Sequence, residues 1–588
     1  MFDGKQRPHH KKHMDTQRLI LLVVFSFSVL MLWEAWQKEQ RGPLPAVAKP
    51  QAGSDAGVPA PSVPEPASSA TGSAAVPAAM SGRADAGVPG VPGAADAAPR
   101  ARARIKVTTE LMVVEIDPLG GDIVRLELLK HKDGLDISKN LVLFAPEHRY
   151  AAQSGFTAAQ LPNHKTLYAT PQSEFVLGAG QQKIEVRLQA TMPEGATATK
   201  TLVFHRDNYL IDIVHEALNA TKSPITTKAY FHLTRDGKAP AEDSAMLMTF
   251  TGPALYTERT KYQKISWSDI DKNKAEFPAG LWGEGWVAMV QHYFVSALVA
   301  PESVKREFYL GKVDDYYRVG AMLNVGTIEP GARATATMQL YAGPQEQDKL
   351  SALAPGLDLV VDYGWLTVFA APLFWLLRVF HDGISLGGIR FPGTGNWGWA
   401  IVLLTIMVKL VFFPLSAASY RSMAKMKLVA PRLTKLREQY GDDRAKLNQA
   451  MMEMYKQEKI NPLGGCLPIV VQIPVFIALY WVLLGSVELR QAPFMGWIQD
   501  LSTPDPWYVL PVFMLISMVI QTKMSPAPPD PVQAKVMMAM PFIFGVMFFW
   551  FPAGLVLYWF VNNVLSIGQQ WQIGRMFSEK KAGSPAKR

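Results

Sequence analysis

Five long apolar segments in the last third of the chain restrict its fold more than any other feature of the sequence. With charged loops between them, they occupy residues 362–381, 397–415, 467–487, 507–524 and 537–567. A helix needs about 20 apolar residues to cross the hydrocarbon core of a membrane, and most of these segments approach that length. The 588-residue chain also has ordinary water-soluble character between residues 105 and 350. The sequence therefore predicts an α-helical membrane bundle that carries a large soluble domain.

The N-terminal region contains one more apolar segment. "LILLVVFSFSVLMLW" follows a basic stretch, residues 1–18, and such a segment can be a signal peptide. No small-residue cleavage site follows, so we expect an uncleaved transmembrane anchor at 19–36 with residues 1–18 in the cytoplasm. Residues 37–104 are rich in Ala, Pro and Gly and contain no aromatic residue. Because they offer too little apolar surface to fold, we expect a disordered periplasmic linker.

Residues 105–350 have the features of a large antiparallel β-sandwich. Stretches such as "IKVTTELMVVEI" and "ATATMQLYAGP" are rich in β-branched and aromatic residues, and turns such as "DPLGGD" separate them. The carboxylates and His292 of this region form no recognisable catalytic or metal-binding pattern. The single cysteine, Cys466, excludes an intrachain disulfide and any Cys-based zinc site. We therefore expect no catalytic residue, no metal and no cofactor.

The charges of the loops predict the topology. The loop at 416–465 carries ten Lys and Arg residues against five acidic residues, so the positive-inside rule places it in the cytoplasm. The domain at 105–350 then lies in the periplasm, and a single span must separate the two. We assign that span to 397–415 and interpret 362–381 as an amphipathic helix at the outer interface. Spans at 467–487, 507–524 and 537–567 give five in total with the anchor, and the basic tail at 568–588 is cytoplasmic.

Lys409 is a charge inside an apolar segment, "AIVLLTIMVKLVFFPL". A charge at the centre of a membrane helix costs about 2.5–3.5 kcal/mol on insertion scales. Two explanations are open: the side chain extends to the cytoplasmic interface, or it faces a water-filled cavity within the bundle. Thr405 lies on the same helical face, and Gln472 in another span could provide a polar partner. A simpler alternative to a water-filled cavity is that these polar residues form ordinary hydrogen bonds between helices.

The loop at 416–465 is predicted to be a helical hairpin that is basic and rich in methionine. Leu433, Leu436 and Tyr440 fall on one helical face, and "GDD" after them is a turn and a potential helix cap. One interpretation is a solvated charged surface that touches anionic lipid head groups. The other is a docking arm for a partner or a nascent chain, because Met-rich apolar faces adapt to varied sequences.

Several stretches resemble the YidC family of bacterial membrane protein insertases. They are "MAKMK", "GDDRAKLNQAMMEMYKQEKINPLGGCLPIVVQIPVFIALYWVLLGSVELRQAPFMGWIQDLS", "QTKMSP", "WFPAGLVLYWFVNNVLSIGQQW" and, in the soluble region, "GWVAMVQHYF" and "YAGPQEQDKLSALAPGLDLVVDYGWL". The resemblance covers roughly residues 105–575. It implies a periplasmic β-supersandwich of the type with a large domain, five spans in the inner membrane, and a hydrophilic groove open to the cytoplasm and to lipid.

The resemblance also implies roles for individual residues. Lys409 stands where Gram-negative relatives usually have arginine, and the groove would be lined by Lys409, Thr405, Gln472 and Trp559. The surface along which a substrate helix exits would comprise Phe476, Met547, Phe551 and Tyr558. The stretch at 382–396 is longer than in relatives. Implied partners are nascent membrane proteins, the ribosome, the Sec translocon and anionic lipids, without sequence-specific nucleic-acid binding.

Two other functions remain open from the residues alone. A secondary transporter needs a dedicated small-molecule site and usually inverted repeats, and the apolar segments contain no Asp, Glu or His pair for proton coupling. A membrane-tethered periplasmic protein that binds or processes carbohydrates would need paired carboxylates in the β-domain. The resemblance favours an insertase that is not an enzyme.

Overall fold

The computed structural model describes residues 103–241, 249–302, 304–386, 388–441, 443–458, 467–525 and 531–582. The expected anchor at 19–36, nearly all of the expected linker at 37–104 and the last residues of the tail lie outside this part of the chain.

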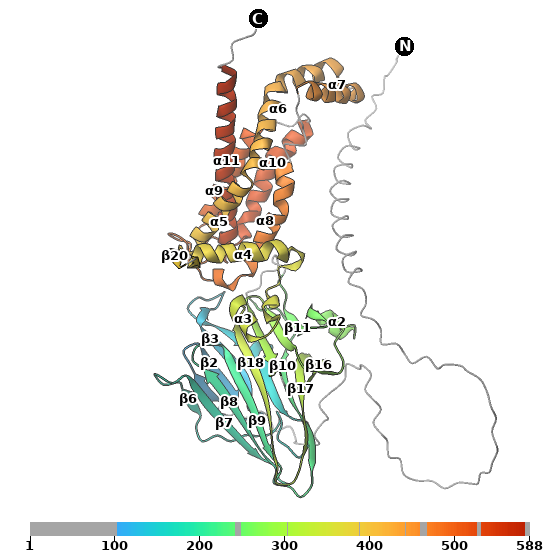
Figure 1. The fold of residues 1–588 in the computed structure, drawn as a ribbon, viewed down its shortest axis with the longest axis vertical. Helices are drawn as coiled ribbons and strands as arrows, with labels where there is room; N and C mark the ends of the chain where they lie inside the picture. Colours follow the sequence, from blue (N-terminus) through green and yellow to red (C-terminus); the bar gives the residue numbers. More distant parts are fainter. Residues whose placement is uncertain are drawn as a thin grey trace, which may run out of the picture. The chain divides into compact units, whose positions relative to one another are not determined.

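Residues 105–344 form two large β-sheets, which we call the β-domain (Figure 1). Ten strands make the first sheet, in the spatial order β13 (Leu281–Trp282), β16 (Arg306–Val313), β17 (Tyr316–Ile328), β10 (Ile225–Arg235), β5 (Ala151–Phe156), β3 (Asp122–Lys132), β2 (Met112–Asp117), β1 (Ile105–Thr108) and β6 (Glu174–Val176), with β4 (Asn140–Phe144) paired to β3. Eight strands make the second, in the order β12 (Lys261–Lys264), β11 (Gly252–Thr257), β14 (Trp286–Gln291), β15 (Phe294–Val299), β18 (Arg333–Pro344), β9 (Leu210–Leu218), β8 (Thr197–His205) and β7 (Lys183–Thr191). Neighbouring strands are antiparallel except β1 and β6, so the large β-sandwich is as predicted from the sequence.

Alternating burial explains how the two sheets pack. In β10, Phe231 and Leu233 are fully buried in the core between the sheets, and the intervening residues point to the opposite face of the sheet. Trp286 of β14 and Leu340 of β18 belong to the same core. Short helices join or cover the strands: η1 (Pro146–His148), α2 (Trp267–Asp271), α3 (Gln347–Leu353), η2 (Leu357–Val360) and η3 (Gly364–Leu366).

The C-terminal region is helical, as expected. Its helices are α4 (Thr367–Asp382), α5 (Trp397–Val411), α6 (Phe413–Tyr440), α7 (Arg444–Gln457), α8 (Leu467–Gly485), α9 (Val509–Met524), α10 (Pro531–Met547) and α11 (Ala553–Ala582), with the short turns η5 (Val487–Leu489) and η6 (Phe548–Trp550). Figure 1 shows α4 lying across one end of α5 and α8, and α7 at the opposite end of the bundle. The expected interfacial helix at 362–381 corresponds to α4.

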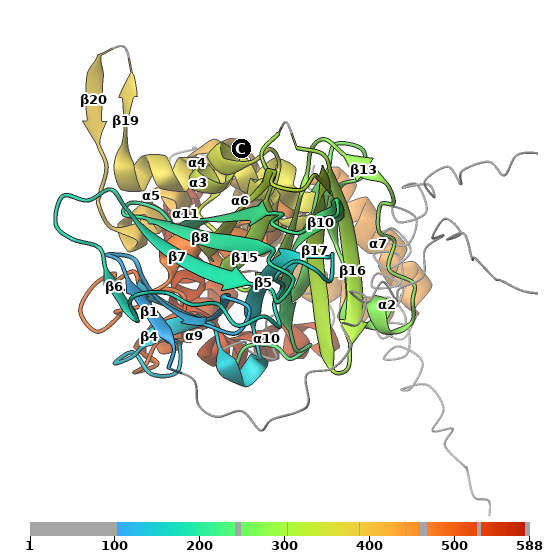
Figure 2. The same ribbon diagram turned by 90° about the horizontal axis from the view of Figure 1, so that it is seen from below.

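The stretch at 382–396, noted as an extension, folds as a β-hairpin. Strands β19 (Gly383–Leu386) and β20 (Ile389–Pro392) pair antiparallel, and Figure 2 shows the hairpin projecting from the end of α4. The backbone amide of Thr394 donates a hydrogen bond to the carbonyl of Phe380, which closes the loop. The Asn396 side chain then accepts a hydrogen bond from the amide of Trp399 at 3.1 Å and starts α5.

The helix boundaries differ from the expected spans at two places, both beside a proline. The segment expected at 397–415 ends as a straight helix at Val411, and α6 begins at Phe413, with Pro414 in its first turn. The segment expected as one span at 537–567 is divided into α10 and α11. Phe551 is extended there because the following Pro552 disfavours the helical conformation.

Taken singly, none of the described helices combines the length and the apolar composition of a membrane span. The pair Trp397–Val411 and Phe413–Met426 meets that standard together, across a bend of 66°. The number of spans stays a prediction.

Candidate functional site

A groove with a volume of about 420 Å³ lies among six helices of the bundle. It is lined by residues of α5, α6, α8, α9, α10 and α11: Lys409, Ser416, Ser419, Tyr420, Met423, Gln472, Ile473, Phe476, Met518, Gln521, Thr522, Ser525, Met537, Tyr558, Trp559, Asn562, Asn563, Ser566 and Gln570. Apart from Lys409, most of these side chains carry a hydroxyl or an amide, and the others are aromatic, methionine or isoleucine. Among these lining residues Lys409 is the one with a full charge, so the groove combines a largely apolar surface with hydroxyl and amide groups and one positive charge.

Lys409 is held inside the groove by the last helix. Its Nζ donates a 2.8 Å hydrogen bond to Oγ of Ser566, and the residue is 6% exposed. Ser566 in turn donates to the carbonyl of Asn562 at 2.7 Å. No carboxylate of the described residues lies within salt-bridge distance of Lys409. The ammonium is therefore oriented toward the groove by a neutral partner and keeps its charge available to an acidic group.

A polar stripe along α11 forms one wall of the groove. Tyr558, Asn562, Ser566 and Gln570 follow one another at intervals of four residues, which places them on the same helical face. Gln472 of α8 donates to Oδ1 of Asn562 at 3.3 Å.

A second polar stripe belongs to α9. Asn563 donates to Oγ of Ser517 at 3.3 Å, and Gln521, Thr522 and Ser525 continue the lining one and two turns further on. The Nε2 of Gln570 donates to the carbonyl of Met524 at 3.2 Å, so α9 and α11 are joined at both ends of this wall.

The groove ends where apolar packing begins. Ile401 and Leu404 of α5, Leu479 and Val482 of α8, and Val556 of α11 are each at most 1% exposed. These residues lie in the half of the bundle next to α4, whereas the lining residues of α5, α8 and α11 lie in the other half. Apolar packing therefore closes the groove toward α4.

The structure brings together most of the residues singled out from the sequence. Lys409, Gln472, Trp559, Phe476 and Tyr558 all line the groove. The rings of Phe476 and Trp559 lie 4.2 Å apart between centroids, and those of Phe476 and Tyr558 lie 6.0 Å apart. This aromatic cluster contributes to the apolar part of the groove surface.

Three of the singled-out residues lie outside the lining set. Thr405 is 1% exposed and donates to the carbonyl of Ile401 in its own helix at 2.7 Å, because it sits one turn deeper in the apolar packing. Met547 ends α10 and is half-buried. Phe551 lies in the break between α10 and α11, where its ring contacts those of Tyr480 and Phe548.

Sequence reasoning missed the contributions of α6 and α9. Ser416, Ser419 and Tyr420 come from the first turns of α6, which was expected to be wholly part of the cytoplasmic hairpin. The α9 residues had a readable signal, since Ser517, Gln521 and Ser525 repeat every four residues within an apolar helix. Ser566 belongs to the same kind of repeat in α11.

The chain closely matches proteins of known family. A curated relative from Aromatoleum aromaticum, named membrane protein insertase YidC, is 54% identical over 577 residues, which is 97% of this chain and 100% of the relative. The chain belongs to the YidC family. A relative of the same name from Dechloromonas aromatica is 51% identical over 98% of this chain and 100% of its own length.

The family models divide the chain as the fold does. Residues 104–376 match the model of the YidC periplasmic domain, and residues 390–581 match the model described as the 60Kd inner membrane protein. A solved structure described as an active YidC insertase with its first transmembrane domain resolved covers 80% of this chain and 92% of its own, at 16% identity and a TM-score of 0.37. The regions matched by the two family models adjoin each other close to the β19–β20 hairpin. This member of the YidC family therefore combines a β-domain and a helical insertase domain.

Proposed function

We propose that this insertase uses the groove to receive the polar flank of a nascent membrane segment while the apolar segment passes into lipid. The observation that carries the proposal is a groove closed toward α4 that holds hydroxyl and amide side chains and one charged lining residue, Lys409. Polar groups in the groove can hydrate a polar flank that would otherwise meet hydrocarbon. Lys409 attracts acidic residues of that flank, and the flank thereby crosses part of the bilayer at reduced cost.

Apolar side chains beside the groove support an exit toward lipid. Ile473 of α8 and Met538, Phe542 and Ile543 of α10 are between 46% and 66% exposed. Transfer of a substrate segment from the groove to lipid is favourable by about 25 cal/mol per Å² of apolar area removed from water. The aromatic cluster of Phe476, Tyr558 and Trp559, together with Met547 and Phe551 farther along, would contact the segment on its way.

The topology follows from the same proposal. The end of the groove away from α4, together with α6 and α7, would face the cytoplasm. The β-domain would lie in the periplasm, with both chain termini in the cytoplasm. In α6 and α7, Val429 and Met454 pack together, and Arg432 pairs with Glu458 across the hairpin at 2.5 Å. The basic surface of this hairpin would meet the ribosome, the nascent chain and anionic lipids, and the chain would act alone or beside the Sec translocon.

The role of Lys409 can be tested with a reconstituted insertion assay. The substrate is a single-span protein with an acidic translocated tail, and a version with a neutral tail serves as the matched substrate. We expect Lys409→Ala to slow insertion of the acidic-tailed substrate about fivefold to tenfold, equivalent to about 1–1.4 kcal/mol, and the neutral-tailed one much less. Lys409→Arg should retain the rate, because it keeps the charge, and Lys409→Glu should lower it further.

A control variant separates the groove from general surface charge. Lys523→Ala removes an exposed lysine near the same end of α9 that does not line the groove, and it should insert both substrates at the normal rate. Insertion of the acidic-tailed substrate by Lys409→Glu at the rate of the unchanged protein would contradict the charge-attraction role. Normal insertion of both substrates in cells depleted of the protein would contradict the insertase proposal itself.

A further inference from the structure

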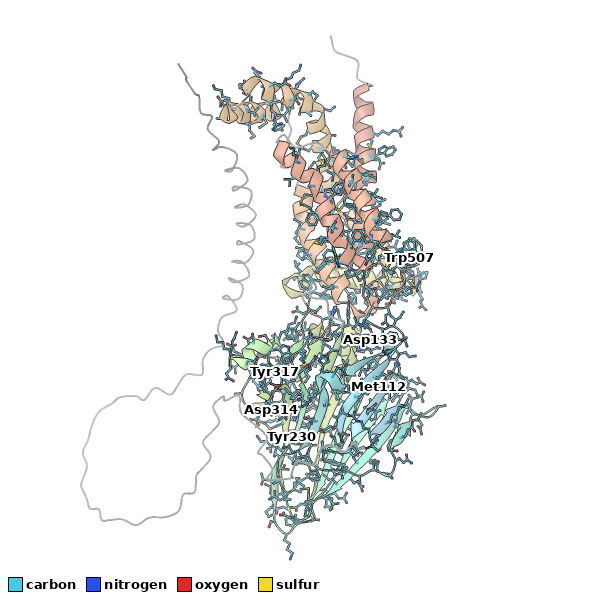
Figure 3. The ribbon with its side chains drawn as sticks, turned by 180° about the vertical axis from the view of Figure 1, so that it is seen from behind. Met112, Asp133, Tyr230, Asp314, Tyr317 and Trp507 are labelled. Carbon is cyan, nitrogen blue, oxygen red and sulfur yellow. The ribbon has the colours of Figure 1, made fainter. Side chains whose placement is uncertain are left out.

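The β-domain contains a second cavity, far from the groove in sequence, on the outer face of the ten-stranded sheet. It has a volume of about 340 Å³ and is lined by Arg104, Val124, Pro146, Arg149, Tyr150, Ala151, Gln153, Thr234, Val313, Asp314, Tyr316 and Arg318. Three of these residues are arginines and one is an aspartate, so the lining carries a net positive charge. Asp314 is labelled in Figure 3. A volume of this size is within the range of small-molecule sites.

Two of the three arginines have no acidic partner among the residues that the structure describes. Arg104 pairs with Glu115 at 3.2 Å. Arg149 and Arg318, in contrast, are within salt-bridge distance of no carboxylate in the described part of the chain. The Arg149 guanidinium instead lies 4.9 Å from the centroid of the Tyr316 ring, which keeps its donors directed away from the ring face. A planar guanidinium that is stacked in this way presents its N–H groups in a fixed fork.

The guanidinium of Arg318 has one N–H donor without a hydrogen-bond acceptor among the described residues. Its Nε is buried, yet it finds no hydrogen-bond acceptor among the described residues. A buried donor without a partner is unfavourable, and native structures seldom leave one without a reason. An oxyanion seated against this edge of the guanidinium would supply the missing acceptor and would be held by two parallel N–H···O bonds.

One lining residue of the cavity, Gln153, belongs to a chain of hydrogen bonds. Gln153 lines the cavity, donates to Oδ2 of Asp122 at 2.7 Å, and accepts from Nε2 of His232 at 3.1 Å. The hydroxyl of Tyr309 then donates to Nδ1 of His232 at 2.8 Å. These bonds hold the Gln153 side chain in place before any ligand arrives.

The same sheet face extends beyond the cavity and is covered. Tyr230, His232 and Thr234 alternate along β10 on this outer face, and Tyr230 contacts His164 of the covering loop; Tyr230 is also labelled in Figure 3. Burial lowers the pKa of His164 to about 4, and the nearby charge of Arg318 acts in the same direction. His164 is therefore neutral at pH 7, and the arginines supply the positive charge of the cavity.

From this arrangement we propose that the β-domain binds a small anionic ligand, one that carries a phosphate or carboxylate group, between Arg149 and Arg318. Such a group could belong to a free solute of the periplasm or to the head group of an anionic lipid. This inference is independent of the groove, because no residue of the cavity belongs to the helical bundle.

The test is isothermal titration calorimetry of the full-length protein in phosphatidylcholine nanodiscs, with inorganic phosphate and with acetate at constant ionic strength. We expect saturable binding of at least one of the two anions. Arg149→Gln and Arg318→Gln should each weaken it at least tenfold, and Arg318→Lys should weaken it less. Arg333→Gln, which removes an exposed arginine of β18 outside the cavity, should leave it unchanged.

A second measurement identifies the source and guards against misfolding. Hydrogen exchange of the β17 amides should slow when phosphate is added, or when phosphatidylglycerol replaces phosphatidylcholine in the nanodisc. Protection by phosphate indicates a free solute, and protection by phosphatidylglycerol alone indicates a lipid head group. Arg149 is exposed, so its replacement should leave the exchange of the ligand-free domain unchanged. Absence of both protection and saturable binding, or equal weakening by Arg333→Gln, would overturn the proposal.

Discussion

Two lysines in the described part of the chain are almost completely buried, and their partners differ. Lys200 of β8 is 1% exposed and lies 3.8 Å from Oδ1 of Asp122, while its Nζ donates to the carbonyl of Gly120 at 3.1 Å. Lys409 is 6% exposed and has the hydroxyl of Ser566 as its partner. A buried ion pair compensates its own charges, whereas a lysine bound to a hydroxyl remains an uncompensated charge. This difference suits Lys200 to a structural role and Lys409 to a functional one.

The Asp122–Lys200 pair gives the first prediction. Lys200→Met should lower the free energy of unfolding of the β-domain by about 3–5 kcal/mol, because it leaves Asp122 buried without its partner. The double variant Lys200→Met with Asp122→Asn should regain most of this loss. Hydrogen exchange of β3 and β8 in the full-length protein measures both, with Lys183→Met on the exposed surface as the control. Equal destabilisation by the single and the double variant would contradict the pairing.

His131 gives a prediction of pH dependence. Burial lowers the pKa of His131 from its usual 6.5 to about 4, and Arg490 and Lys349 act in the same direction. The unfolded chain therefore takes up this proton at a higher pH than the folded chain does. The free energy of unfolding should fall by about 1.4 kcal/mol per pH unit as the pH is lowered from 6.5 toward 4.

The contribution of His131 can be isolated by replacement. His131→Phe keeps an aromatic ring against Phe294, whose centroid lies 5.4 Å away, but removes the titration. Its pH dependence between 6.5 and 4.5 should be flatter than that of the unchanged protein by the amount given above. Hydrogen exchange of β3 and β15, corrected for the intrinsic effect of pH, measures the slope. An unchanged slope would show that His131 does not take part.

At the level of elements, short sequence signals at helix ends match the observed boundaries. Asp443 is the N-cap of α7, and its Oδ1 accepts from the amide of Lys446 at 3.2 Å, in the turn expected from "GDD". Asn396 starts α5 in the same way. These signals are reliable because a cap depends on the local backbone and not on distant packing.

The cap of α7 gives a prediction for the hairpin. Asp443→Ala should cost about 1 kcal/mol of helix stability, because one amide of the first turn loses its acceptor. Asp443→Asn should retain most of the effect, since its side-chain oxygen can accept the same bond. Faster hydrogen exchange of the first turn of α7 in the alanine variant, with little change in α8, is the expected result. Equal exchange in the alanine and asparagine variants would argue against the cap.

For the whole molecule, the proposed topology predicts that the β-domain is accessible from outside the cell membrane and that the α6–α7 hairpin is not. In a Cys466→Ser background, Glu438→Cys in α6 should be protected from a membrane-impermeant maleimide in spheroplasts, and Lys183→Cys in the β-domain should react. Both positions should react after the membrane is permeabilised, which is the control for accessibility. Labelling of the α6 position in intact spheroplasts would contradict a cytoplasmic hairpin.

The sequence determined the main parts of this protein. Stretches rich in β-branched and aromatic residues, with turn residues between them, predicted the β-sandwich. Apolar segments with basic loops predicted the helical region, because both patterns are local properties of the sequence. Long quoted stretches identified the family, and the comparisons confirm it. Polar residues within apolar helices, such as Lys409 and Gln472, were also visible in the sequence.

Only the tertiary structure decided which of these residues meet. Thr405 shares a helical face with Lys409 in the sequence, yet it is sealed by the packing of Ile401 and its neighbours, whereas Ser566, 157 residues from Lys409, is the partner of the lysine. The same holds for the arginine-lined cavity, whose residues come from five strands and from several segments between strands. Side-chain spacing fixes the face of one helix or strand, but the depth of a groove depends on how several elements pack together.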